Sequence, residues 1–204
     1  MELNIEKLNC SDCRHVTSIP QLPELVKLDC SGCKNLTNIP ILPKLKVLDC
    51  AYCTAFTSIP LLPELVWLRC INCKSLTNIP LLPKLIELHC TGCKSLTSIP
   101  ILPKLEKLDC TAFTSIPLLP ELEILHCKNL TSIPILPKLK VLDCYDCKVL
   151  TSIPLLPKLV ELHCTSLTSL TSIPVLPELV KLHCSGCTKL ISRPLLPQLV
   201  FLYC

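Results

Sequence analysis

Aromatic residues are scarce in this chain of 204 residues, which contains three Phe, three Tyr and one Trp. Binding of single-stranded nucleic acid relies on a basic groove with aromatic rings on which the bases stack. The net charge is only +4, and acidic residues are interleaved among the basic ones. The composition therefore predicts no nucleic-acid partner.

Long apolar runs are also missing, although half of the residues are hydrophobic. Prolines and charged residues interrupt every apolar run well short of the roughly 18 residues that a membrane span requires. The first ten residues, MELNIEKLNC, contain no apolar core of a secretory signal peptide. We therefore expect no membrane association and a reducing compartment, the cytoplasm, in which thiols persist.

A catalytic motif is absent as well. Serine occurs mainly within a recurring T-S-I-P, and no Ser, His and acidic residue stand together in a way that this recurrence does not explain. We predict that the protein is not an enzyme and that it has no cofactor.

What fills the chain is one twenty-residue unit. Residues 25–44 read LVKLDCSGCKNLTNIPILPK and residues 85–104 read LIELHCTGCKSLTSIPILPK, so the shared pattern is LxxLxCxxCxxLTxIPxLPx. Such a unit cannot bury its own apolar face and must stack on its neighbours. The units begin at residues 5, 25, 45, 65, 85, 105, 122, 139, 159 and 179, and a truncated one covers 199–204.

Two units are three residues shorter than the rest. Residues 105–121 and 122–138 each lack one C-x-x step, which fuses their two Cys positions into one at Cys110 and Cys127. Regular stacking is least certain to continue at these two units.

The unit divides into a strand and a Pro-rich segment. All twenty prolines fall in ten copies of I-P-x-L-P or a variant, and two prolines three residues apart exclude a helix and favour extended, polyproline-like backbone. The LxxLxC half alternates as a strand does: Leu28 inward, Asp29 outward, Cys30 inward. The inward positions are 1, 4, 6, 9, 12, 15 and 18, and the three glycines, all at position 8, mark the turn after the strand.

At this point the residues resemble a known family. L-x-x-L-x-L-x-x-N/C-x-L is the pattern of leucine-rich repeats, in which Cys30 takes the place of the third Leu and Cys33 that of the Asn/Cys position. The I-P-x-L-P tail is similar to the short repeats of bacterial effectors that bind host proteins. The doubled Cys positions resemble arrays encoded by large DNA viruses of amoebae, which implies the host cytoplasm.

The resemblance and the repeat together predict a leucine-rich repeat solenoid, a right-handed and mostly β superhelix with little or no α-helix. About ten or eleven short strands would form one parallel sheet on one face, with polyproline-like segments on the other. We expect a single domain over residues 1–204, with a partial N-terminal cap at 1–4. The ubiquitin-ligase domain that some bacterial effectors append is not expected, because residue 204 lies inside a repeat.

The eighteen cysteines allow three interpretations. Eleven occupy position 6 and seven occupy position 9, which gives the spacing C-x2-C-x16-C-x2-C of zinc sites. The same spacing follows from a twenty-residue repeat with Cys in two inward columns, and Leu167 replaces one of them, as expected for small buried hydrophobic residues. Disulfides between stacked strands are the third interpretation, although strands lie about 4.8 Å apart, slightly beyond ideal Cβ spacing.

Positions 2, 3, 5 and 7 point outward on the sheet side, which is the usual ligand face of leucine-rich repeats. Position 5 carries four histidines, and His163 and His183 occupy adjacent repeats, which suggests either ordinary surface residues or a two-His metal site. We assign no residue to a metal site.

Trp67, the only Trp, stands at position 3 beside an Arg and apolar residues, a composition typical of a binding hot spot. The alternative is a chance substitution in a repeat array, because isolated apolar surface residues are normal. The candidate protein-binding residues are Val47, Asp49, Tyr52, Trp67, Arg69, Glu87 and His89.

The last strand, at 199–204, is apolar and has no polar cap, so its edge is predicted either to recruit another copy of the chain through Phe201 and Tyr203 or to fray. The sequence thus favours a protein-binding module whose partner it does not identify. A Cys-rich metal or redox protein and a self-associating structural component are the alternatives.

Overall fold

The structure, a computed structural model, describes residues 5–191, 194 and 196–204. It consists of two compact units, Met1–Leu105 and Glu106–Cys204, which we describe one at a time. The division falls at the beginning of the first seventeen-residue repeat. The partial cap at 1–4 and the unusual Arg193, which replaces the Ile of other repeats, lie outside the described residues.

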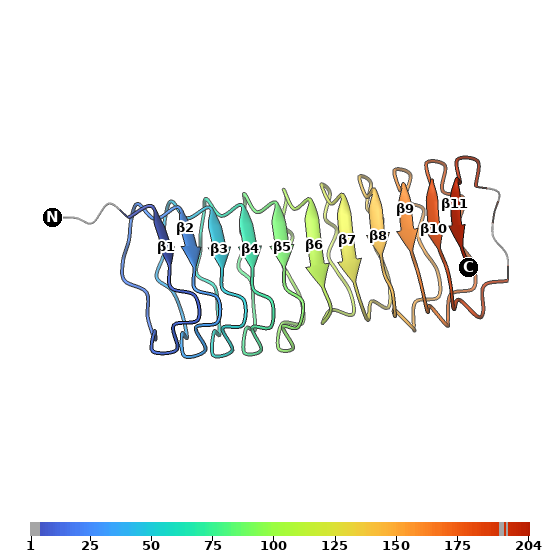
Figure 1. Ribbon diagram of the computed structural model, residues 1–204. Helices are drawn as coiled ribbons and strands as arrows, with labels where there is room; N and C mark the ends of the chain where they lie inside the picture. Colours follow the sequence, from blue (N-terminus) through green and yellow to red (C-terminus); the bar gives the residue numbers. More distant parts are fainter. Residues whose placement is uncertain (1–4, 192–193, 195) are drawn as a thin grey trace. The chain divides into compact units, whose positions relative to one another are not determined.

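Five parallel strands, one per repeat, form the sheet of the first unit and lie side by side in chain order (Figure 1). Neighbouring strands pair one repeat apart, so that Leu28 faces Leu48 and Leu48 faces Leu68. The register therefore repeats the sequence period. The strands are β1 (Lys7–Asn9), β2 (Lys27–Asp29), β3 (Val47–Asp49), β4 (Trp67–Arg69) and β5 (Glu87–His89).

The second unit has six parallel strands, again in chain order. No helix occurs in the described part of either unit. The described residues therefore include no helix that could cross a membrane. The predicted fold class, a solenoid of short parallel strands without helix, is confirmed. The strands are β6 (Lys107–Cys110), β7 (Ile124–Cys127), β8 (Val141–Asp143), β9 (Glu161–His163), β10 (Lys181–His183) and β11 (Phe201–Tyr203).

The core consists of the seven inward columns that the sequence predicts. In the repeat at 25–44 all seven positions are at most 4% exposed, and the described residues include no buried polar or charged side chain. Phe56 and Phe113 are the largest fully buried side chains. Because burying each Leu or Ile contributes about 1.5–3 kcal/mol, these columns provide a large core without the help of many aromatics.

The two short repeats keep the register by lengthening their strands. β6 and β7 have four residues each, and Cys110 pairs with Cys127 at the added position. Both fused cysteines are 1% exposed, so one side chain fills the inward space that two occupy elsewhere. Pairing continues regularly from β7 to β8, with Leu125 opposite Leu142.

In each full-length repeat the chain leaves the strand through a turn, and the residue at position 8 of this turn has a positive φ. Gly32, Gly92 and Gly186 lie there, as predicted, with φ between 74° and 76°. Non-glycine residues adopt the same conformation in other repeats, and Tyr52 is the bulkiest of them, with φ 62°. A side chain with a Cβ is strained in this region, so the turn imposes a cost wherever glycine is absent.

The Pro-rich segments run along the other face without forming helix. Neighbouring segments make isolated parallel bridges, Ser58 with Asn78 in the first unit and Ser152 with Ser172 in the second. The alternating charges at position 20 form ion pairs between adjacent repeats. These exposed pairs each contribute about 0–1 kcal/mol and favour correct register. They are Lys44–Glu24, Lys84–Glu64, Lys138–Glu121 and Lys158–Glu178.

Candidate functional site

The predicted binding residues lie on three adjoining strands of the first unit. Six of the seven belong to β3, β4 and β5, at positions whose side chains face away from the core, and Tyr52 lies in the turn three residues beyond β3. The six strand residues therefore form one continuous surface, which we call the β3–β5 face. Whether it binds a partner stays a prediction.

Trp67 lies in the middle of the β3–β5 face. In the parallel register it is flanked by Val47 on β3 and Glu87 on β5. Its ring also contacts His89, with centroids 5.8 Å apart and planes inclined at 54°. Trp67 is half-buried by these neighbours, so part of a rigid apolar ring remains accessible.

One ion pair and one histidine–carboxylate contact hold the polar residues of the face in place. Arg69 Nη1 donates to Asp49 Oδ2 at 3.0 Å, and His89 Nε2 lies 3.3 Å from Glu87 Oε2. These contacts restrain side chains that would otherwise lose conformational entropy when a partner binds. The β3–β5 face is thus partly pre-organised.

Asp49 also has a structural task that the sequence analysis did not recognise. Its Oδ1 accepts the backbone N–H of Ala51 at 3.1 Å, and Asp29 does the same for Ser31. A carboxylate that accepts the backbone N–H two residues further on forms an Asx turn, which explains why Asp and Asn recur at position 5. Position 5 departs from this rule at Arg69 and His89, and it does so again at the histidines and Tyr203 of the second unit. The feature that marks the β3–β5 face is therefore Trp67 beside Arg69.

Two histidines of the second unit, His163 and His183, form a stack rather than a chelating pair. The rings of His163 and His183 are 4.5 Å apart and nearly parallel, and His183 also stacks on Tyr203 at 4.2 Å. Stacked rings present their faces, not their nitrogen lone pairs, to one another. Burial, together with the charges of His163 and Lys181, lowers the pKa of His183. No group of three metal-ligating residues occurs among the described residues.

Phe201 and Tyr203, the predicted self-association residues, lie on β11, which pairs with β10 in register. Both side chains are about half exposed, at 51% and 50%. The strand is therefore formed, not frayed. Self-association through it stays a prediction.

Most of the cysteines belong to the core, where fourteen of the eighteen are buried. The thiols at position 9 donate to the backbone carbonyl of position 6 in the preceding repeat, as in Cys53 to Cys30 O at 3.0 Å and Cys93 to Cys70 O at 2.8 Å. This contact gives the small side chain a hydrogen-bonding role in addition to packing. Burial raises the pKa of Cys110 to about 12, and it raises that of Cys144 well above its ordinary value.

An exposed aliphatic column on the Pro-rich side was missed by the sequence analysis. Position 17, the variable residue of I-P-x-L-P, is aliphatic in eight successive described repeats, four in each unit, and every one of these side chains is more than half exposed. The signal was present, because only Gln21 breaks the column in the described residues. The members are Ile41, Leu61, Leu81 and Ile101 in the first unit and Leu118, Ile135, Leu155 and Val175 in the second.

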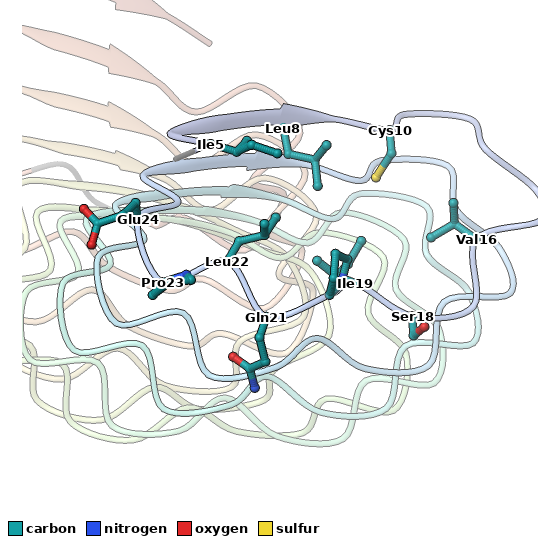
Figure 2. Close-up of a pocket in the computed structure, with 11 residues that line it drawn as sticks. Ile5, Leu8, Cys10, Val16, Ser18, Ile19, Gln21, Leu22, Pro23 and Glu24 are labelled. Carbon is teal, nitrogen blue, oxygen red and sulfur yellow. The ribbon is translucent and has the colours of Figure 1, made fainter. Parts of the chain in front are cut away.

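A hollow of about 960 Å³ lies against the first repeat (Figure 2). Its apolar lining consists of inward columns: Ile5, Leu8, Ile19 and Leu22 gather inside the coil in Figure 2. The same columns are covered by the preceding coil in the repeats that follow. The hollow is therefore lined mainly by the inward columns of the first repeat, with Ser18, Gln21 and Glu24 as its polar residues.

Comparisons with known proteins give likenesses to solved structures alone. No protein-family model matches the chain, and no curated protein matches it. Among solved structures, the chain is similar to a leucine-rich repeat protein from Bacteroides ovatus ATCC 8483, with 17% sequence identity and a TM-score of 0.36 over 93% of this chain and 75% of that one. The fold assignment rests on the strands and buried columns described above.

Proposed function

We propose that this protein is a non-enzymatic module that binds a protein partner through the β3–β5 face. The observation that carries the proposal is Trp67, a partly accessible ring held between Val47 and Glu87 with Arg69 on the same strand. Trp, Tyr and Arg are the residues most enriched where binding energy concentrates at interfaces.

Tyr52 supports the same face. It is 49% exposed and stands in a left-handed turn position where other repeats have Gly, Asn, Asp or Ser. A bulky residue in that conformation costs stability, so its presence next to β3 is explained by a role that a smaller residue would not fill. The resemblance to effector-type and amoebal-virus repeats makes a cytoplasmic host protein the proposed class of partner.

The test begins with affinity capture from the native source on immobilised full-length protein, followed by binding measurements with the partner obtained. Trp67→Ala and Arg69→Glu should each weaken binding at least about tenfold, since hot-spot truncation typically costs 2 kcal/mol or more. Val141→Ala, at the same position 3 on the second unit, is the matched control and should bind as the unchanged protein does.

The same experiment also tests a second surface, the exposed aliphatic column, as the site of contact. Leu61→Glu and Leu81→Glu place charges in the exposed aliphatic column without touching the sheet side. If these two variants lose binding while Trp67→Ala and Arg69→Glu retain it, the contact lies on the Pro-rich side and the proposal for the β3–β5 face is wrong.

A further inference from the structure

Several buried thiols of the interior donate hydrogen bonds to backbone carbonyls. At position 6, Cys30 Sγ donates to Asp49 O at 3.4 Å and Cys164 Sγ donates to His183 O at 3.3 Å, each on the following strand. The side chains of these two cysteines are fully buried. Burial therefore shields both thiols from reagents in solution.

The pattern changes between β10 and β11. Cys184 Sγ and Cys204 Sγ lie 3.2 Å apart, in direct contact, one position beyond the registered pair His183 and Tyr203. Cys184 is 5% exposed, whereas Cys204 is exposed. Both thiols, together with Cys187, line a hollow of about 240 Å³ that is open to solvent.

The sulfur separation of this pair and the spacing of its two strands are compatible with a disulfide. Neighbouring strands lie about 4.8 Å apart, which is within the Cα separation of about 4.4–6.8 Å that disulfides accept. The sulfurs must approach by a little over 1 Å to reach the bonded distance of about 2.05 Å, a shift that side-chain rotation supplies. Exposure of Cys204 gives an attacking reagent a path to one sulfur of the pair.

We infer that Cys184 and Cys204 are a reversible redox site that is oxidised by a low-molecular-weight disulfide of the glutathione class. The inference does not depend on the proposed protein-binding function. Closing the bond would fasten β11 to β10 at the position where Tyr203 already stacks on His183.

The reaction consists of two thiol–disulfide exchanges. The Cys204 thiolate attacks one sulfur of oxidised glutathione, the S–S bond breaks, and one glutathione leaves with the electron pair and takes up a proton. Cys184, after its proton passes to solvent, attacks Cys204 Sγ in the mixed disulfide and expels the second glutathione. One protein S–S bond forms, two protein thiols are oxidised, and one glutathione disulfide is reduced to two thiols.

The experiment treats the reduced full-length protein with oxidised glutathione at pH 8, blocks remaining thiols, and maps peptides by mass spectrometry under non-reducing conditions. The expected product is a peptide pair joined through Cys184 and Cys204, with the loss of two hydrogens, which disappears on adding reduced glutathione. Cys144 and Cys164, registered neighbours in the same column, are the internal control and should remain thiols.

Two further measurements keep the inference falsifiable. Cys204→Ser, at an exposed position, should fold and show no cross-link, and in the unchanged protein oxidation should slow amide hydrogen exchange of β11 at least several-fold. The inference is overturned if Cys204 stops at the mixed disulfide, if it links only to a second copy of the chain, if Cys184 pairs instead with Cys187, or if no bond forms with excess oxidised glutathione.

Discussion

Buried thiols make the stability of this protein sensitive to alkaline pH. Desolvation in the core raises the pKa of Cys110 from 9.0 to about 12. The folded state therefore keeps this proton above pH 9, whereas the unfolded chain releases it. Stability that is fully present below pH 9 must fall as the pH rises from 9 toward 12, because the folded state binds more protons in that range.

The magnitude follows from the two pKa values. Between pH 9 and pH 10 the unfolded thiol goes from half ionised to about nine-tenths ionised, which lowers the free energy of unfolding by about 1 kcal/mol for Cys110. The pKa is also raised at seven other buried thiols, by hydrogen bonding with a neighbouring thiol or by burial. It is lowered at three of their buried partners, Cys53, Cys93 and Cys147, which offset part of this effect. The seven are Cys30, Cys33, Cys50, Cys70, Cys127, Cys144 and Cys164.

The assay is urea unfolding at pH 7, 8, 9 and 10 in a phosphine reductant, followed by circular dichroism. The free energy of unfolding should change little between pH 7 and 8 and fall steeply between pH 9 and 10. Cys110→Val is the matched control, since it removes one thiol while keeping an apolar side chain of similar size. Its fall between pH 9 and 10 should be smaller by about 1 kcal/mol. Equal stability at pH 9 and 10, or an unchanged slope in the variant, would refute the reasoning.

Two predictions concern the left-handed turn at position 8, both measured by urea unfolding at pH 7. Gly92→Ala should destabilise the folded protein by about 1–2 kcal/mol, and by more than Gly186→Ala does. Both positions have a positive φ, but of the two added Cβ atoms only the one at 92 would meet Asn72 Oδ1, at 2.2 Å. Equal costs would show that the contact with Asn72 is irrelevant. Tyr52→Gly should stabilise by about 0.5–1 kcal/mol, since the strain of a side chain at φ 62° exceeds the entropy cost of glycine. A destabilised Tyr52→Gly would mean that packing of the ring outweighs backbone strain.

The seven inward columns could be predicted from the sequence because all of them follow one strict period. A Leu at position 4 must face the core in every repeat once it does so in one, and Leu28, Leu48 and Leu68 are all fully buried. The period also located the turn at position 8. It did not reveal how a seventeen-residue repeat is accommodated, because a deletion does not specify whether strand or turn absorbs it; the added strand residue at Cys110 is a result of backbone pairing.

Outward positions were predicted less completely, for two physical reasons. Asp49 was predicted only as a protein-binding residue, whereas the hydrogen bond that it accepts from the Ala51 N–H depends on backbone geometry two residues further on. The exposed aliphatic column at position 17 was overlooked because apolar residues are expected inside, and a variable position in a Pro-rich segment has no periodicity of its own that distinguishes inward from outward. Leu61, at 60% exposure, shows that an apolar residue that recurs in every repeat of a series need not face the core.

The two outward surfaces, the position-17 column and the β3–β5 face, differ in how their residue types vary from repeat to repeat. The position-17 column is uniform along each unit, so it distinguishes no repeat from the next and suits a contact that every repeat makes alike. The β3–β5 face is local: Trp67, Arg69 and His89 replace the smaller or acidic residues that occupy the equivalent positions on β2 and β3, Lys27 excepted. Binding energy at protein interfaces concentrates in a few central residues surrounded by near-neutral contacts. A surface on which a Trp, an Arg and a His adjoin one another therefore fits specific recognition better than an aliphatic column does, and this is why the β3–β5 face is the first surface to test.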